Sequence, residues 1–66
     1  MRFRIDYYRE GVKVASAVSY EPLEGARFES KRGLRMHRAD QAQIRDLEKA
    51  GQLVERVERD PRDPDR

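Results

Sequence analysis

His37 and Asp40 come nearest to a catalytic pair, because a histidine beside a carboxylate can act as a general base. His37 is the single histidine of the chain. It also lies near the end of a predicted helix, where a basic side chain satisfies the last carbonyls and the negative end of the helix dipole. The serines stand in no motif that would activate a nucleophile. We therefore predict no catalytic residue and no enzymatic activity.

Metal and cofactor sites have no candidate ligand set. The chain contains no cysteine, and one histidine without cysteine cannot form a typical zinc site. No acidic loop has the spacing of calcium ligands, and neither a phosphate-binding loop nor a nucleophile elbow occurs. We predict that the protein uses no metal and no cofactor.

A basic stripe on the predicted helix is the candidate for nucleic-acid binding. At 100° per residue its members fall within about 80° of arc. These members are Arg27, Lys31, Arg35 and Arg38. Such cations could contact phosphates, with Tyr8, Arg2, Arg4 and Lys13 as a stacking platform on the first hairpin. The net charge of only +2 favours the alternative of an ordinary solvated helix edge.

Apolar residues outside the expected core are the candidates for a protein interface. They are Ala15 and Ala17, expected on the outer face of the sheet, and Phe28 and Met36 on the helix. Single exposed apolar residues are common. Together, on a chain with a small core, they predict a homodimer that associates through the outer sheet face or through pairing of an edge strand.

Two strands are predicted to begin the chain, because residues 2–8 and 12–18 alternate between apolar and polar or small side chains. Glu10 and Gly11 fit a two-residue hairpin turn. That turn would pair Tyr7 with Val14, Ile5 with Ser16 and Phe3 with Val18. All three valines of the second strand would then face the core.

A helix over residues 22–37 follows, with Pro22 at its first position and Glu24 in its first turn. Its buried stripe would consist of Leu23, Ala26, Ser30, Leu34 and His37. Gly33 lowers helix stability, so we expect fraying or a bend there.

Residues 41–59 allow two interpretations. Asp40 could cap a helix that Gly51 ends, or strands over 42–47 and 53–59 could form a second hairpin. A two-stranded sheet would be marginal, which favours the hairpin. The predicted fold is α+β, a ββαββ chain with an antiparallel sheet of two hairpins and one helix packed on one face. The predicted core is Phe3, Ile5, Tyr7, Val12, Val14, Val18, Leu23, Ala26, Leu34, Ile44 and Val57.

Three segments resemble a group of short uncharacterised proteobacterial proteins. They are the opening MRFRIDYY with Gly11, the LEGA at 23–26 and the run ADQAQIRD at 39–46. The resemblance covers residues 1–60 and implies the same ββαββ arrangement. It implies no activity.

Length and composition complete the sequence-based interpretation. The chain has 66 residues, of which 42% are charged and 36% hydrophobic. We predict one domain over residues 1–59 and a disordered charged tail over 60–66, where Arg-Asp-Pro recurs. The charged N-terminus lacks the apolar run of a signal peptide, so we expect a cytoplasmic protein. Because a core of this size is marginal, we predict a small non-enzymatic interaction or regulatory module that self-associates, with nucleic-acid binding as the alternative.

Overall fold

Four strands and one long helix form the part of the chain described by the computed structural model, residues 1–59. In chain order the elements are β1 (Phe3–Arg9), β2 (Val12–Ser19), α1 (Leu23–Met36), β3 (Gln41–Asp46), the short 3₁₀ helix η1 (Leu47–Lys49) and β4 (Gln52–Glu58). The predicted ββαββ order is confirmed, and residues 41–59 form the hairpin rather than a helix. The tail predicted over residues 60–66 lies outside the described residues.

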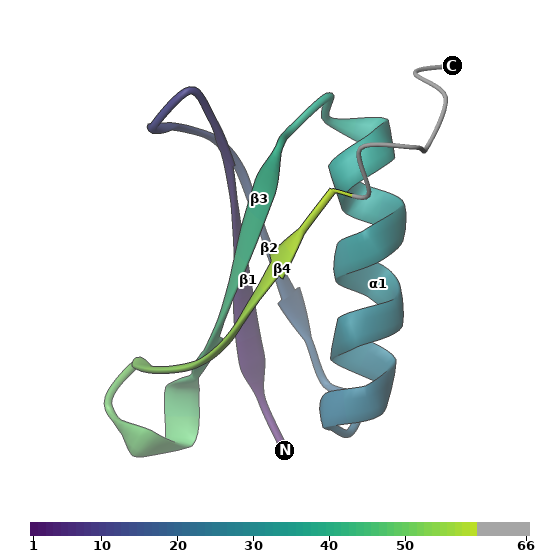
Figure 1. Cartoon of the computed structure of the whole chain (residues 1–66). Helices are drawn as coiled ribbons and strands as arrows, with labels where there is room; N and C mark the ends of the chain where they lie inside the picture. The colour runs from purple at the N-terminus through teal and green to yellow at the C-terminus, as the bar shows by residue number, and fades with distance from the viewer. Residues whose placement is uncertain (60–66) are drawn as a thin grey trace.

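The strands form a single antiparallel sheet in the order β2-β1-β3-β4. β1 and β3 are therefore central, and each hairpin contributes one edge strand. Helix α1 packs along one face of this sheet (Figure 1). We call the opposite face, which no other element of residues 1–59 covers, the outer face.

Both hairpin turns use left-handed backbone. Glu10 and Gly11 have φ values of 52° and 81°, the two positive values that characterise a type I′ turn. This confirms the predicted turn. In the second hairpin, Ala50 and Gly51 are left-handed after η1, which begins where the Asp46 carboxylate accepts a hydrogen bond from the Glu48 amide.

Because of a β-bulge in β2, the strand register differs from the predicted one. Arg9 pairs with Val12 and Tyr8 with Lys13, but Tyr7 pairs with Ala15 rather than with Val14. The extra residue shifts the remaining pairs by one, and a shift of one residue turns each side chain to the opposite face. The helix-facing side of β2 therefore carries alanine and serine.

The core differs from the predicted one at the three valines, of which Val14 and Val18 are affected by the bulge and Val12 lies before it. Val12, Val14 and Val18 are exposed, so their assignment to the core was wrong. Leu23 is partly buried against the core, and the other predicted members lie within it. Ala39 and Ala42, which were not predicted, are fully buried. The buried apolar residues are Phe3, Ile5, Tyr7, Ala26, Leu34, Ala39, Ala42, Ile44 and Val57.

Gly33 allows close contact between α1 and the sheet. The helix continues through Gly33 to Met36, so the predicted fraying does not occur at Gly33. A Cβ atom at position 33 would lie 2.0 Å from the Tyr7 hydroxyl oxygen and 2.2 Å from Cζ. The Tyr7 hydroxyl donates a hydrogen bond to the Glu29 carbonyl at 3.3 Å. Position 33 thus holds glycine because the ring of Tyr7 occupies the space of a side chain.

The end of α1 differs from the predicted limit. His37 caps the helix, and Arg38 adopts a left-handed φ of 53°. The amide of Arg38 bonds to the carbonyl of Arg35 and that of Ala39 to Leu34, the pair of bonds that defines a Schellman motif. Arg38 therefore lies beyond the helix rather than in its last turn.

Replacing Gly33 with alanine should destabilise the protein, although the same change in an exposed helix is stabilising by up to about 1 kcal/mol. The clash with the Tyr7 ring should lower the free energy of unfolding by about 2–3 kcal/mol. Urea denaturation measures this change. Lys31→Ala, an exposed position two residues earlier in α1, serves as the control and should change stability by less than about 0.5 kcal/mol. A Gly33→Ala protein as stable as the parent would contradict the Tyr7 contact.

Because of Tyr7, the free energy of unfolding should depend on pH in the alkaline range. Burial and, secondarily, the charge of Glu29 raise the pKa of Tyr7 above its ordinary value of 10.0. The folded chain then holds this proton more tightly than the unfolded chain, so stability falls as pH rises above 10 towards the folded pKa. Denaturation across this range should show a smaller decline for Tyr7→Phe than for the parent. As a control, the free energy of unfolding of Tyr8→Phe should fall over this pH range as that of the parent does.

Candidate interaction surfaces

A groove runs between α1 and the edge strand β2 on the helix-facing side of the sheet. Two adjoining hollows form it, and Glu29 and Arg32 of the helix line both. Ala17 and Met36 line the first hollow, and Phe28 the second. The small side chains on β2 leave this space open, which follows from the bulge. We call these two hollows the α1–β2 groove.

The rim of the α1–β2 groove is apolar and exposed. Phe28 is 63% exposed, Met36 68% and Tyr20 73%. Val18 also lines the second hollow and is exposed. The guanidinium of Arg32 lies 5.9 Å from the centre of the Phe28 ring, a distance at which a cation and an aromatic face attract each other.

Three of the four predicted interface residues line this groove. Ala17, Phe28 and Met36 line it, and Ala15 packs against the core beside it. Ala15 and Ala17 were predicted on the outer face, which was wrong, because the bulge turns them towards the helix. Tyr20 and Val18, which also line the second hollow, were not predicted as members. Tyr20 follows the end of β2, and the register pairs Val18 with Arg4 of the outer face, so strand alternation does not point to either residue.

The two edges of the sheet differ sharply in charge. β2 carries one charged side chain, Lys13 near its start, and none over residues 14–19, whereas β4 carries Glu55, Arg56 and Glu58. Charged residues on edge strands normally discourage pairing with other chains. The free edge beside the α1–β2 groove lacks this protection. This difference is visible in the sequence once the edge strands are known.

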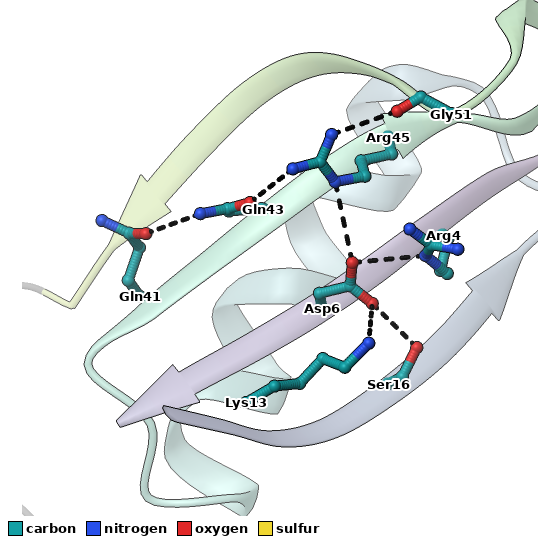
Figure 2. A network of polar contacts seen from close by, with 8 residues as sticks. All are labelled: Arg4, Asp6, Lys13, Ser16, Gln41, Gln43, Arg45 and Gly51. Carbon is teal, nitrogen blue, oxygen red and sulfur yellow. Dashed lines mark hydrogen bonds and ion pairs between the residues drawn. The ribbon is translucent and has the colours of Figure 1, made fainter. Parts of the chain in front are cut away.

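A buried carboxylate organises the outer face. Asp6 on β1 is 1% exposed, although no element covers that face. Its Oδ2 accepts a hydrogen bond from Arg4 Nε at 3.2 Å, and its Oδ1 accepts one from Ser16 Oγ at 2.9 Å. Lys13 Nζ and Arg45 Nε complete the cluster, each 3.8 Å from a carboxylate oxygen. Figure 2 shows the cationic side chains converging on Asp6.

From Arg45, hydrogen bonds continue the Asp6 cluster along β3 through two glutamine side chains. Arg45 donates to the Gly51 carbonyl at 3.1 Å and to Gln43 Oε1 at 3.0 Å. Gln43 in turn donates to Gln41 at 3.1 Å (Figure 2). The strand alternation predicts Arg4, Asp6 and Tyr8 on this face, but it does not predict that Asp6 is buried. A lone acid in an alternating strand gives no sign that three cations will cover it.

The predicted basic stripe of the helix is partly neutralised. Arg27 bonds to Glu55 of β4, with Nη2 2.6 Å and Nε 2.7 Å from the same carboxylate oxygen. This hydrogen bond is the main cause that raises the pKa of Arg27. Lys31 and Arg35 remain on the same edge of α1, but Arg38 lies beyond the helix end. The structure therefore does not align all four cations on one helix.

His37 and Asp40 serve separate structural contacts. The ring of His37 lies 4.8 Å from that of Tyr7. The Asp40 carboxylate accepts a hydrogen bond from the backbone amide of Glu10, 3.0 Å away, which ties the first hairpin turn to the start of β3.

Comparisons with known proteins leave the function open. No family model, curated protein or solved structure matches this chain. The resemblance to short proteobacterial proteins therefore stays a prediction. Among residues 1–59, no helix is both long and apolar enough to span a membrane. The same residues contain no group of three or more His, Cys, Asp or Glu side chains that could hold a metal ion.

Replacing Asp6 with asparagine should destabilise the fold. The amide oxygen still accepts the Ser16 hydrogen bond, but three neighbouring cations lose their counter-charge. Because those cations are partly exposed, we expect a loss of about 1–3 kcal/mol, less than for a fully buried pair. Thermal or urea unfolding measures it. Glu58→Gln removes an exposed acid from β4 and should change stability by less than about 0.5 kcal/mol. Equal effects of the two substitutions would argue against the cluster.

Proposed function

We propose that this protein is a small interaction module that associates with a second copy of itself through β2 and the α1–β2 groove. The observation that carries the proposal is the uncharged stretch at residues 14–19. It lies on a free sheet edge in a chain of which 42% is charged. An uncharged stretch of an edge strand offers its backbone groups to another strand.

A second copy fits this edge because antiparallel pairing of β2 with itself is symmetric. A two-fold axis perpendicular to the sheet would place both helices on the same side, and a two-fold interface uses the same patch on each copy. The two α1–β2 grooves would then adjoin one another. Phe28 and Met36 of each helix would gain apolar neighbours instead of water.

Exposed apolar side chains beside β2 would contribute area to such a dimer. Tyr20 and Phe28 would each bury on the order of 100–150 Å² of ring surface at their present exposure. Met36, Val18 and an edge strand of eight residues add to this. A standard interface buries roughly 800 Å² per partner, so the dimer would have to cover the paired strand and the groove rim together. A second copy also covers apolar surface that the small core leaves exposed.

Sedimentation velocity over a range of concentrations tests the proposal. The parent protein should change from monomer to dimer with rising concentration. The double variant Ala17→Lys and Phe28→Lys should weaken the dimer at least tenfold, because it places two charges in the contact. Both positions are exposed, so the monomer should still fold.

The matched control is Val54→Lys on the other edge strand, where the valine is 40% exposed. This variant should dimerise as the parent does. A parent protein that is monomeric up to about 1 mM, or a dimer that the double variant does not weaken, would refute the proposal.

A further inference from the structure

We propose that the outer face of the sheet binds single-stranded nucleic acid. Tyr8 would stack on a base, and Arg4, Lys13 and Arg45 would contact phosphates. This surface lies opposite α1, on the other side of the sheet from the α1–β2 groove. In the sequence-based prediction, Tyr8, Arg2, Arg4 and Lys13 of the first hairpin only supplemented the basic stripe of the helix, and Asp6, Arg45, Gln41 and Gln43 were not part of it.

The cations of the outer face are held in place before any ligand arrives. Arg4, Lys13 and Arg45 all point to the Asp6 carboxylate. Their side chains remain 40%, 51% and 30% exposed, while that of Asp6 is 2% exposed. One buried negative charge thus orients three accessible positive ones. Side chains that are already ordered lose less entropy on binding.

The outer face as a whole is positive. The register places Arg56 opposite Gln43 and Glu58 opposite Gln41 on this face. Together with the Asp6 cluster, this face then carries four cations and two acids, a net charge of +2. The cations are Arg4, Lys13, Arg45 and Arg56, and the acids are Asp6 and Glu58. Phosphates are attracted to such a surface, and binding releases their counterions.

Tyr8 supplies the feature that distinguishes a nucleic acid from other anions. It follows the buried Tyr7 on β1, so the alternation of the strand turns it to the outer face. It pairs with Lys13 on one side and Gln41 on the other, and its side chain is half-buried. A base can stack on an aromatic ring of an open sheet, as in common RNA-binding domains.

The neighbouring amides favour a nucleic acid over an acidic protein segment. Gln41 and Gln43 lie on the central strand β3 beside the cations (Figure 2). Amides both donate and accept hydrogen bonds, as base edges do. The centre of this face is polar, whereas the core of a protein interface is apolar and poor in charge.

Fluorescence anisotropy with labelled single-stranded RNA and DNA of mixed sequence tests this site. At low salt the parent protein should bind, and three phosphate contacts predict a log–log salt slope of roughly −2. Tyr8→Ala should weaken binding about tenfold or more. Tyr8→Leu, which keeps a large side chain on the strand, should have the same effect and guards against loss of folding. Lys13→Ala should weaken binding and reduce the slope by about 0.7.

Three controls separate this site from the alternatives. Lys31→Ala on the helix should change affinity less than twofold. The Ala17→Lys and Phe28→Lys protein should still bind, which separates this site from self-association. A polyglutamate peptide should bind more weakly, because it offers charge without bases. Absence of binding at low salt, equal binding of the peptide, or sensitivity to Lys31 but not Tyr8 would each overturn the proposal.

Discussion

The contact between Tyr7 and Gly33 determines how closely the helix approaches the sheet. The Tyr7 ring fills the space that any side chain at position 33 would need, and its hydroxyl reaches the backbone one turn earlier in α1. His37 packs against the same ring. Tyr7 belongs to a central strand, so α1 is anchored over the middle of the sheet. With one helix and four strands, this anchoring leaves room beside β2, and the α1–β2 groove follows from it.

The bulge at Val14 decides what that groove contains. Without the extra residue, Val14 and Val18 would face the helix and close the space with branched side chains. With it, Ala15, Ala17 and Ser19 face the helix. Ser19 is buried and donates a hydrogen bond to Glu29, which fixes the start of the groove. The valines are turned out of the core, which reduces the apolar surface that a single chain can bury. One inserted residue thus both opens a groove and creates a reason to associate.

The sequence was sufficient for the elements and insufficient for the register. The Glu10-Gly11 turn and the positions of the strands are local signals, and local signals identified them correctly. The start of α1 was predicted one residue too early, because Pro22 caps the helix and Leu23 is its first residue. The bulge could not be predicted from local signals, because Val14 is not a glycine or another residue type that is typical of a bulge. Gly33 was interpreted by its helix propensity alone, since its partner Tyr7 is far away in the chain.

Phe28 and Met36 were recognisable as exposed apolar residues, but their proximity to Ala17 depends on the corrected register. Asp6 could not be identified as a buried residue, because its burial comes from side chains on three strands.

The two sides of the sheet have different chemistry because β1 alternates without interruption. Its odd positions Phe3, Ile5 and Tyr7 enter the core, and its even positions Arg4, Asp6 and Tyr8 form the outer face. Edge pairing of two β2 strands would leave the outer faces free and place them side by side in one extended sheet. A flexible single strand could then contact both copies. Once it is bound to one copy, the second contact is intramolecular and adds affinity without new residues. Self-association through β2 would therefore strengthen binding on the outer face, although the side chains that line the α1–β2 groove are not those that would contact the nucleic acid.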